Sequence, residues 1–262
     1  MEINKIYCEN CLDTMSKMPD GFVDLVVTSP PYDNLRKYNG YSFDFEAIAK
    51  ELFRVVKTGG VVVWVVGDAT VNGSETGTSF RQALHFMEVG FSLYDTMIYQ
   101  KTGNPTPQKP EIRYANAFEY MFVFCNGERP KAINLIKQKN GCAVGEKKVW
   151  SKMQKNGKTL KYAGQISDEG ILQNVWQIDS VNETFESRPH PAPFAEMLAK
   201  RHIYSWSNEG DLVYDPFIGS GTTAKMAHLQ NRKWIGSEIS AEYVALAEKR
   251  IDPYLRQTKL EI

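Results

Sequence analysis

Short apolar runs alternate with amphipathic stretches along most of this 262-residue chain. Runs rich in β-branched and aromatic residues predict strands at 3–7, 22–27, 61–66, 97–101, 120–124, 212–214 and 234–238. Stretches with apolar residues every three or four positions predict helices at 45–56, 80–87, 195–204, 224–229 and 241–251. In the second of these helices the predicted apolar face holds Phe80, Ala83, Leu84 and Met87. Strands that alternate with helices indicate an α/β fold with a largely parallel sheet.

The strand at 22–27 runs into the sequence Ser29-Pro30-Pro31-Tyr32. Each proline fixes one φ angle and lacks an N–H group, so the carbonyls of Ser29 and Pro30 become rigidly placed acceptors beside the Tyr32 ring. Acceptors and a ring face are the parts that a site needs to hold a planar base with an amino group. A strand-ending turn with a core tyrosine is the alternative interpretation.

A glycine-rich turn follows the strand at 212–214 and precedes the helix at 224–229, which is the layout of a nucleotide-binding βα unit. No lysine follows its last glycine and the full G-x-G-x-x-G pattern is absent, so it is not a phosphate-gripping P-loop. Glu238 stands at the tip of the next strand, the usual place for a carboxylate that bonds ribose hydroxyls. The turn consists of Asp215, Pro216, Phe217, Ile218, Gly219, Ser220, Gly221, Thr222 and Thr223.

Together, residues 29–32 and 215–223 resemble the catalytic and cofactor motifs of the DNA amino-methyltransferases of restriction–modification systems, which use S-adenosyl-L-methionine. The resemblance covers nearly the whole chain, and the order, catalytic motif first and cofactor motif last, is similar to the β arrangement of that family. It implies a Rossmann-like methyltransferase sheet, mostly parallel with one antiparallel edge strand, in circularly permuted order. The first and last elements should therefore lie near one another.

The resemblance also implies further cofactor contacts outside the glycine turn. Asn10 and Cys11 follow the first strand, and Phe194 precedes the helix at 195–204. The family commonly has an acidic residue at the place of Asn10, so this chain departs from the pattern there. A helix N-cap is the alternative role for Asn10.

Charge is distributed unevenly along the chain. Lysine and arginine total 31, as do aspartate and glutamate, so the formal net charge is zero and any nucleic-acid surface must be local. Residues 129–161 hold ten basic residues but only one acidic residue, Glu146. We therefore expect residues 1–125 and 189–262 to form the catalytic domain and 126–188 to be a target-recognition insertion on double-stranded DNA. A solvated lysine-rich loop is the alternative.

Six basic residues are the candidate DNA contacts. Two lie in the polar loop after Tyr32, where they would touch phosphates near an extruded base, and four lie in the insertion. They are Arg36, Lys37, Lys147, Lys148, Lys152 and Lys155.

The resemblance predicts methyl transfer to the exocyclic N4 of cytosine by base flipping and direct in-line attack, with no covalent enzyme intermediate. Serine rather than aspartate at position 29 favours cytosine, because a hydroxyl can donate to cytosine N3; adenine N6 is the alternative base. Three other functions stay open: methylation of RNA or a protein amide, nicotinamide-dependent oxidoreduction, and DNA binding without activity.

Metal, membrane and export are not expected. Cys8 and Cys11 have C-x-x-C spacing, but no nearby histidine completes a zinc set, which favours a reduced, cytoplasmic protein without metal. No apolar run is long enough to cross a bilayer, and residues 1–5 do not resemble a signal peptide. The resemblance leaves room for a homodimer and for a cognate restriction endonuclease that acts on the same site.

Overall fold

A computed structural model describes residues 1–31, 43–102, 113–140, 147–154, 157–179 and 194–256. The chain forms two compact units, which are described separately. The larger unit comprises Met1–Asn134 and Asn174–Ile262, and the smaller unit is Leu135–Gln173.

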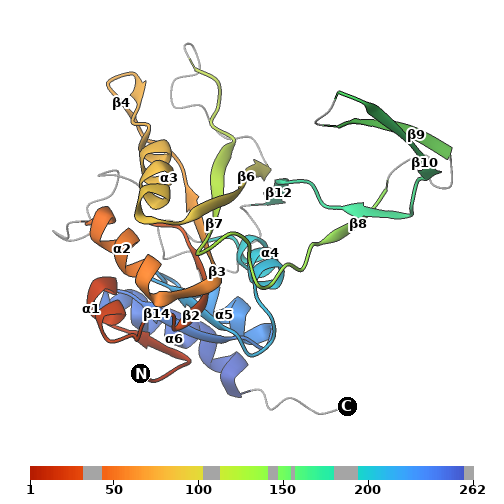
Figure 1. Ribbon diagram of the computed structural model, residues 1–262. Coiled ribbons are helices and arrows are strands. Elements are labelled where there is room, and N and C mark those ends of the chain that lie inside the picture. The colour runs from red at the N-terminus through yellow and green to blue at the C-terminus, as the bar shows by residue number, and fades with distance from the viewer. Residues whose placement is uncertain (32–42, 103–112, 141–146, 155–156, 180–193, 257–262) are drawn as a thin grey trace. The chain divides into compact units, whose positions relative to one another are not determined.

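The larger unit is built on one eight-stranded sheet (Figure 1). Its first five strands are parallel, and the antiparallel strand β7 then separates β3 from β6. The last strand, β12, is parallel to β6. In spatial order the strands are β1 (Lys5–Tyr7), β14 (Lys233–Ser237), β13 (Leu212–Asp215), β2 (Val23–Thr28), β3 (Val56–Val66), β7 (Phe118–Cys125), β6 (Ser92–Thr102) and β12 (Val175–Asp179).

Two layers of helices cover this sheet (Figure 1). Helices α1 (Cys11–Ser16), α2 (Phe45–Val55) and α3 (Thr78–Val89) share a core with Val26, Val62 and Trp64. Helices α4 (Glu196–Trp206), α5 (Thr222–Leu229) and α6 (Ala241–Arg256) contact one another in a second layer. Strand β2 is buried along almost its whole length, as a parallel strand covered on both faces must be.

The described part of the smaller unit consists of two antiparallel ribbons. Strand β9 (Lys147–Met153) pairs with β10 (Thr159–Gln165), and β8 (Lys137–Lys139) pairs with β11 (Glu169–Ile171). A third ribbon, in the larger unit, joins β4 (Thr70–Val71) to β5 (Ser74–Glu75). None of the described helices is long and apolar enough to cross a membrane.

The sheet differs from the sequence expectation at its antiparallel strand. We expected that strand at the edge, but β7 lies inside the sheet because β6 and then β12 extend it further. Strand β12 alternates exposed and buried residues, with Trp176 and Ile178 buried, so it lacks the continuous apolar run that marks the other strands.

The boundary of the compact units also differs from the expected one. Since β12 pairs with β6, residues 175–179 belong to the sheet of the larger unit, although they fall within the expected insertion, 126–188. The recognition role of the insertion stays a prediction. Strand β1 pairs with β14, as a circular permutation would require, and the permutation itself also stays a prediction.

Candidate functional site

The two predicted motifs lie side by side at the carboxyl edge of the sheet. Strands β2 and β13 are parallel neighbours, with Leu25 opposite Val213 and Val26 opposite Tyr214. From β2 the chain continues to α2 in one helix layer, and from β13 it continues to α5 in the other. Such a switch point opens a crevice at the ends of the strands, and it is where open α/β sheets bind their ligands.

Asp215 joins the two motifs through buried hydrogen bonds. Its Oδ1 accepts from the Thr28 hydroxyl at 2.6 Å and from the Phe217 amide at 3.0 Å, and its Oδ2 accepts from the Thr223 hydroxyl at 2.6 Å. Thr28 immediately precedes Ser29, so one carboxylate fixes the start of both turns. No local pattern marks Thr28 as a site residue, because its partner lies 187 residues away.

Burial raises the pKa of Asp215 from 3.8 to about 6, although the hydrogen bonds from Thr223 and Thr28 oppose this shift. The side chain is only 4% exposed. Its two oxygens are engaged within the protein, so the structure gives Asp215 a role in connecting the turns. Direct contact between Asp215 and a cofactor stays a prediction.

The proline turn follows β2 directly. Pro30 is buried, while Ser29 and Pro31 are partly exposed at the edge of the sheet. Tyr32, together with Arg36 and Lys37, lies outside the described residues.

Close packing explains why glycine stands in the glycine turn and in the strand beside it. Gly221 has φ +82°, and a Cβ there would lie 2.9 Å from Cβ of Ala247 and 3.0 Å from Cδ1 of Ile251 in α6. A Cβ on Gly236 of β14 would lie 2.2 Å from Cδ1 of Ile218. The turn is therefore pressed against both α6 and β14, and only glycine permits that approach.

Glu238 follows β14 and faces the glycine turn. Its Oε2 accepts from the Gly219 amide at 3.1 Å, and its Oε1 accepts from the Ser240 amide at 2.9 Å. Burial raises the pKa of Glu238 above its ordinary value, against these two backbone donors. A carboxylate has about four lone-pair sites, so it retains capacity to accept from a ligand hydroxyl.

Asn10 is the N-cap of α1, as the alternative interpretation proposed. Its Oδ1 accepts from the Leu12 amide at 2.8 Å. Cys11 is buried in the apolar core, and burial raises the pKa of its thiol to about 12, so the side chain stays a neutral thiol. The cofactor role of both residues stays a prediction.

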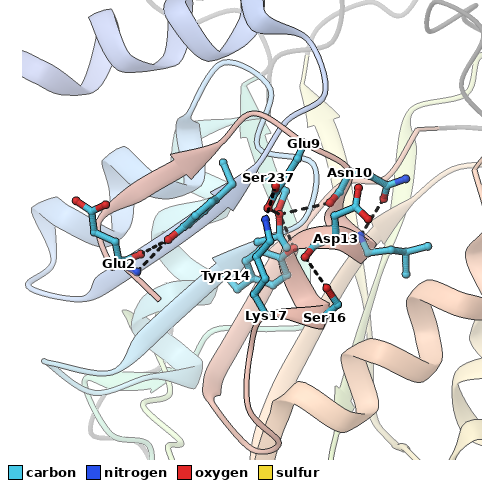
Figure 2. A network of polar contacts seen from close by, with 11 residues as sticks. Glu2, Glu9, Asn10, Asp13, Ser16, Lys17, Tyr214 and Ser237 are labelled. Atoms are coloured by element: carbon cyan, nitrogen blue, oxygen red, sulfur yellow. Dashed lines mark hydrogen bonds and ion pairs between the residues drawn. The ribbon is translucent and has the colours of Figure 1, made fainter.

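Figure 2 shows the polar contacts around the start of α1. Glu9, one position before Asn10, is an acid that the sequence analysis overlooked. Its Oε1 accepts from the Thr14 hydroxyl at 3.0 Å, and the hydrogen bond from Lys17 to its Oε2 lowers its pKa. The buried hydroxyls of Tyr214 and Ser237 lie 2.8 Å apart and join the ends of β13 and β14.

The predicted aromatic contacts have different surroundings. Phe217 packs edge-on against Phe43 and Trp64, at centroid distances of 5.7 and 6.2 Å. It therefore anchors the glycine turn to the apolar core beneath α2 and α3. Phe194 is partly exposed just before α4. Pro216 and Ser220 are buried within the turn.

The candidate DNA contacts of the insertion belong to the smaller unit. Lys152 is exposed on β9, Lys147 and Lys148 form the beginning of that strand, and Lys155 lies outside the described residues. Within the described part of the chain, no cluster of three or more histidine, cysteine or acidic residues could hold a metal ion.

Comparison with known proteins shows the family. A family model of N6/N4 methyltransferases, described as DNA methylase, matches residues 23–249. The chain is 53% identical over 244 residues to the orphan methyltransferase M.BamHII of Bacillus amyloliquefaciens, covering 90% of this chain and 91% of that protein. It is 29% identical to the type II methyltransferase M.BglII of Bacillus subtilis, covering 94% of this chain and 68% of that protein.

Among solved structures, the fold is similar to that of the PvuII DNA methyltransferase, which is described as cytosine-N4-specific. The TM-score is 0.70 at 24% identity, over 96% of this chain and 91% of that one. This likeness supports the Rossmann-like methyltransferase fold that the sequence predicted. With the family match over residues 23–249, it leads to one conclusion: the chain belongs to the N6/N4 DNA methylase family.

Proposed function

We propose that this chain transfers a methyl group from S-adenosyl-L-methionine to the exocyclic N4 of cytosine in double-stranded DNA. The observation that carries the proposal is the buried 2.6 Å hydrogen bond from Thr28 to Asp215. It holds a turn rich in rigid acceptors next to a glycine turn suited to a nucleoside. A transferase needs both binding places within reach of one another.

The residues of the glycine turn fit the methyl donor. Gly219 and Gly221 have positive φ and present backbone without side chains, which lets a ligand approach closely. The Glu238 carboxylate has acceptor sites left after its two backbone hydrogen bonds, so it is suited to bind ribose hydroxyls. When bound, S-adenosyl-L-methionine supplies a methyl group on a positively charged sulfur, which is an excellent leaving group.

The proline turn supplies the other half of the chemistry. The exocyclic amine of a base is a poor nucleophile because its lone pair is delocalised into the ring. Carbonyl acceptors at Ser29 and Pro30 would bond its hydrogens and localise the lone pair on nitrogen as the methyl arrives. Tyr32 would stack on the base once it is extruded from the duplex.

The choice of cytosine over adenine rests on Ser29. A serine hydroxyl can donate to N3 of a neutral cytosine, whereas a carboxylate at the same position cannot. Adenine N6 is the other base that the same turn could accept, and the mechanism would be unchanged.

The proposed DNA surface includes the smaller unit. Its exposed, lysine-rich ribbons have the positive charge that favours phosphates through counter-ion release. A two-stranded β-ribbon is also narrow enough to enter a major groove. We propose this unit as the target-recognition part of the protein.

The relative M.BamHII bears on partners, since it is described as an orphan methyltransferase. We propose that this chain likewise methylates DNA without a cognate endonuclease. A homodimer stays a prediction that the oligomeric state in solution would test.

The test is to incubate the protein with unmethylated genomic DNA and labelled S-adenosyl-L-methionine, digest the DNA to nucleosides, and identify the labelled one by mass. We expect N4-methylcytosine. N6-methyladenine would contradict the choice of cytosine from Ser29 but would agree with the proposed cofactor, DNA substrate and mechanism. Absence of label from DNA, with cofactor binding intact, would contradict DNA as the substrate.

A further inference from the structure

Three charged side chains meet behind the glycine turn, where α4, α5 and α6 pack together. We call Glu196, Lys225 and Arg250 the Arg250 cluster. Oε1 of Glu196 accepts from Nζ of Lys225 at 2.7 Å and from Nη2 of Arg250 at 2.6 Å. The side chains of Arg250 and Lys225 are only 1% and 5% exposed, and that of Glu196 is 28% exposed.

The other end of the Arg250 guanidinium holds the glycine turn itself. Nη1 donates to the Ser220 carbonyl at 3.2 Å, to the Ser220 hydroxyl at 3.1 Å and to the Thr222 hydroxyl at 2.9 Å. Arg250 thus contacts the turn on both sides of Gly221, the residue with φ +82°. One planar side chain fixes the segment in which α5 begins.

Stability alone does not account for this arrangement. Removing ions from water costs several kcal/mol each, and well-packed apolar side chains of similar volume are often as stable or more so. Burial pushes the pKa of Glu196 up, but the hydrogen bonds from Lys225 and Arg250 outweigh it and lower the pKa. Glu196 therefore stays an ionised acceptor for both partners, and the hydrogen bonds of the cluster give the turn a defined geometry.

The cluster also connects segments that the proposed function assigns to the cofactor. Glu196 is the first residue of α4, two positions after Phe194, and Lys225 lies in the first turn of α5. Lys225 also has its Nζ 4.7 Å from the ring centroid of Tyr254 in α6. A change at Arg250 would remove the hydrogen bonds that join the glycine turn to α6 and, through Glu196, to α4.

We propose that Arg250 is a positioning residue that holds Ser220 and Thr222 in the conformation that binds S-adenosyl-L-methionine, with Glu196 orienting its guanidinium. This inference rests on the proposed function, since it assumes that cofactor. Arg250 acts through the turn and touches neither the methyl donor nor the base.

Calorimetric titration of S-adenosyl-L-methionine into the full chain, with methylation rates at limiting and saturating cofactor, tests this role. Arg250→Met should weaken cofactor binding roughly tenfold to a hundredfold, the range of a lost charge-assisted hydrogen bond. Turnover at saturating cofactor should change by less than about threefold, since the catalytic turn is untouched.

Two further variants separate position from folding. Arg250→Lys keeps the charge beside Glu196 but loses the planar fork, so it should restore only part of the affinity. Thr222→Val removes one acceptor of Nη1 and should weaken binding about threefold or more. The matched control is Arg256→Met on the same helix, where the arginine is 78% exposed and pairs with Asp252. This variant should bind S-adenosyl-L-methionine with the affinity of the wild type.

If Arg250→Met is folded and binds the cofactor as the wild type does, the positioning role is wrong. Should that variant not fold, wild-type affinity in both Arg250→Lys and Thr222→Val would overturn the role equally. A wild type that binds no S-adenosyl-L-methionine would contradict the proposed function instead, so the two failures are distinguishable.

Discussion

The glycine turn and the smaller unit, the two proposed binding surfaces, are built in opposite ways. Every residue from 218 to 227 is buried. The turn donates hydrogen bonds to Asp215 and Glu238 and accepts them from Arg250. In the smaller unit, none of the residues whose burial is described is buried. The turn obtains its shape from the core beneath it, whereas the ribbons have no core of their own.

This difference matters because an isolated two-stranded ribbon is only marginally stable in water. Val149 and Met153 of β9 are mostly exposed, although apolar side chains usually stabilise strands by being covered. We therefore expect the larger unit to be ordered before any ligand arrives, and the smaller unit to gain order if it binds DNA as proposed.

The largest expected effect comes from adding one methyl group at matched glycines. Gly221 and Gly157 have φ angles of +82° and +78°, but a Cβ on Gly221 would meet α6, and one on Gly157 has nothing within 4 Å. Gly221→Ala should lower the free energy of unfolding by roughly 2–5 kcal/mol through backbone strain and overpacking. Gly157→Ala should cost at most the backbone strain of about 1–2 kcal/mol, because its added methyl group meets no neighbouring atom.

Urea unfolding of both variants, with cofactor titration, would measure this contrast. Equal destabilisation by the two substitutions would contradict the difference in packing between the two regions.

The second effect is a pH dependence that belongs to Asp215. Because its pKa is raised from 3.8 to about 6, the folded protein keeps a proton between these values that the unfolded chain releases. This group's contribution is therefore fully present below pH 4, and stability falls as the pH rises through 6, by up to about 3 kcal/mol. Asp215→Asn removes the titration. Denaturant unfolding at several pH values gives the stability difference between the wild type and this variant. The difference should decrease as the pH rises from 4 to 7, and a constant difference would contradict the raised pKa of Asp215.

A smaller effect is expected when the link between the turns is cut. Thr28→Val keeps the shape of the side chain but removes the donor to Asp215, which should cost about 1–3 kcal/mol of stability. It should also lower turnover, since Ser29 and the glycine turn lose their common anchor. Ser207→Ala removes another buried hydroxyl, which donates to the Ile203 carbonyl and accepts from Nε of Arg232; it is the control and should leave turnover unchanged at saturating substrates. A normal turnover in Thr28→Val would show that the link is only structural.

The smallest effect concerns single lysines of the ribbons. Lys152→Gln should weaken DNA binding a few-fold for every sequence and reduce the slope of log affinity against log salt by about 1. Lys233→Gln, an exposed lysine at the amino edge of the larger sheet, should leave the slope unchanged. Equal slopes for both variants, measured by fluorescence anisotropy at several salt concentrations, would remove Lys152 from the DNA surface.

The same contrast explains what the sequence could predict. The strands, the proline turn and the glycine turn have local signals, since proline, glycine and apolar runs constrain the backbone where they stand. The face of α3 was predicted wrongly: Phe80, Leu84 and Met87 are exposed, while Gln82 is buried and accepts from the Trp64 indole. Gln82 is buried because it bonds Trp64 of β3, and the spacing of apolar residues along one helix does not reveal such a partner.

Long-range partners account for the other omissions. The hydrogen-bond partner of Thr28 lies 187 positions away in the sequence, and the partners of Arg250 lie 28 to 54 positions away. Neither residue is part of a local motif. The extension of the sheet beyond β6 likewise depended on β12, whose short alternating pattern gave too weak a signal. The two turns were therefore predictable from the sequence, whereas the long-range contacts that fix their positions were not.

Hydrogen exchange of the full chain, free and with S-adenosyl-L-methionine or duplex DNA, would show which region is ordered before its ligand binds. We expect β2 and β13 to be strongly protected in the free protein and the cofactor to add protection at residues 215–223 but not at 159–165. DNA should add protection at 159–165. Strong protection of β10 in the free protein, or a cofactor effect there with none in the glycine turn, would contradict the division between a preordered chemical site and a recognition surface ordered by its ligand.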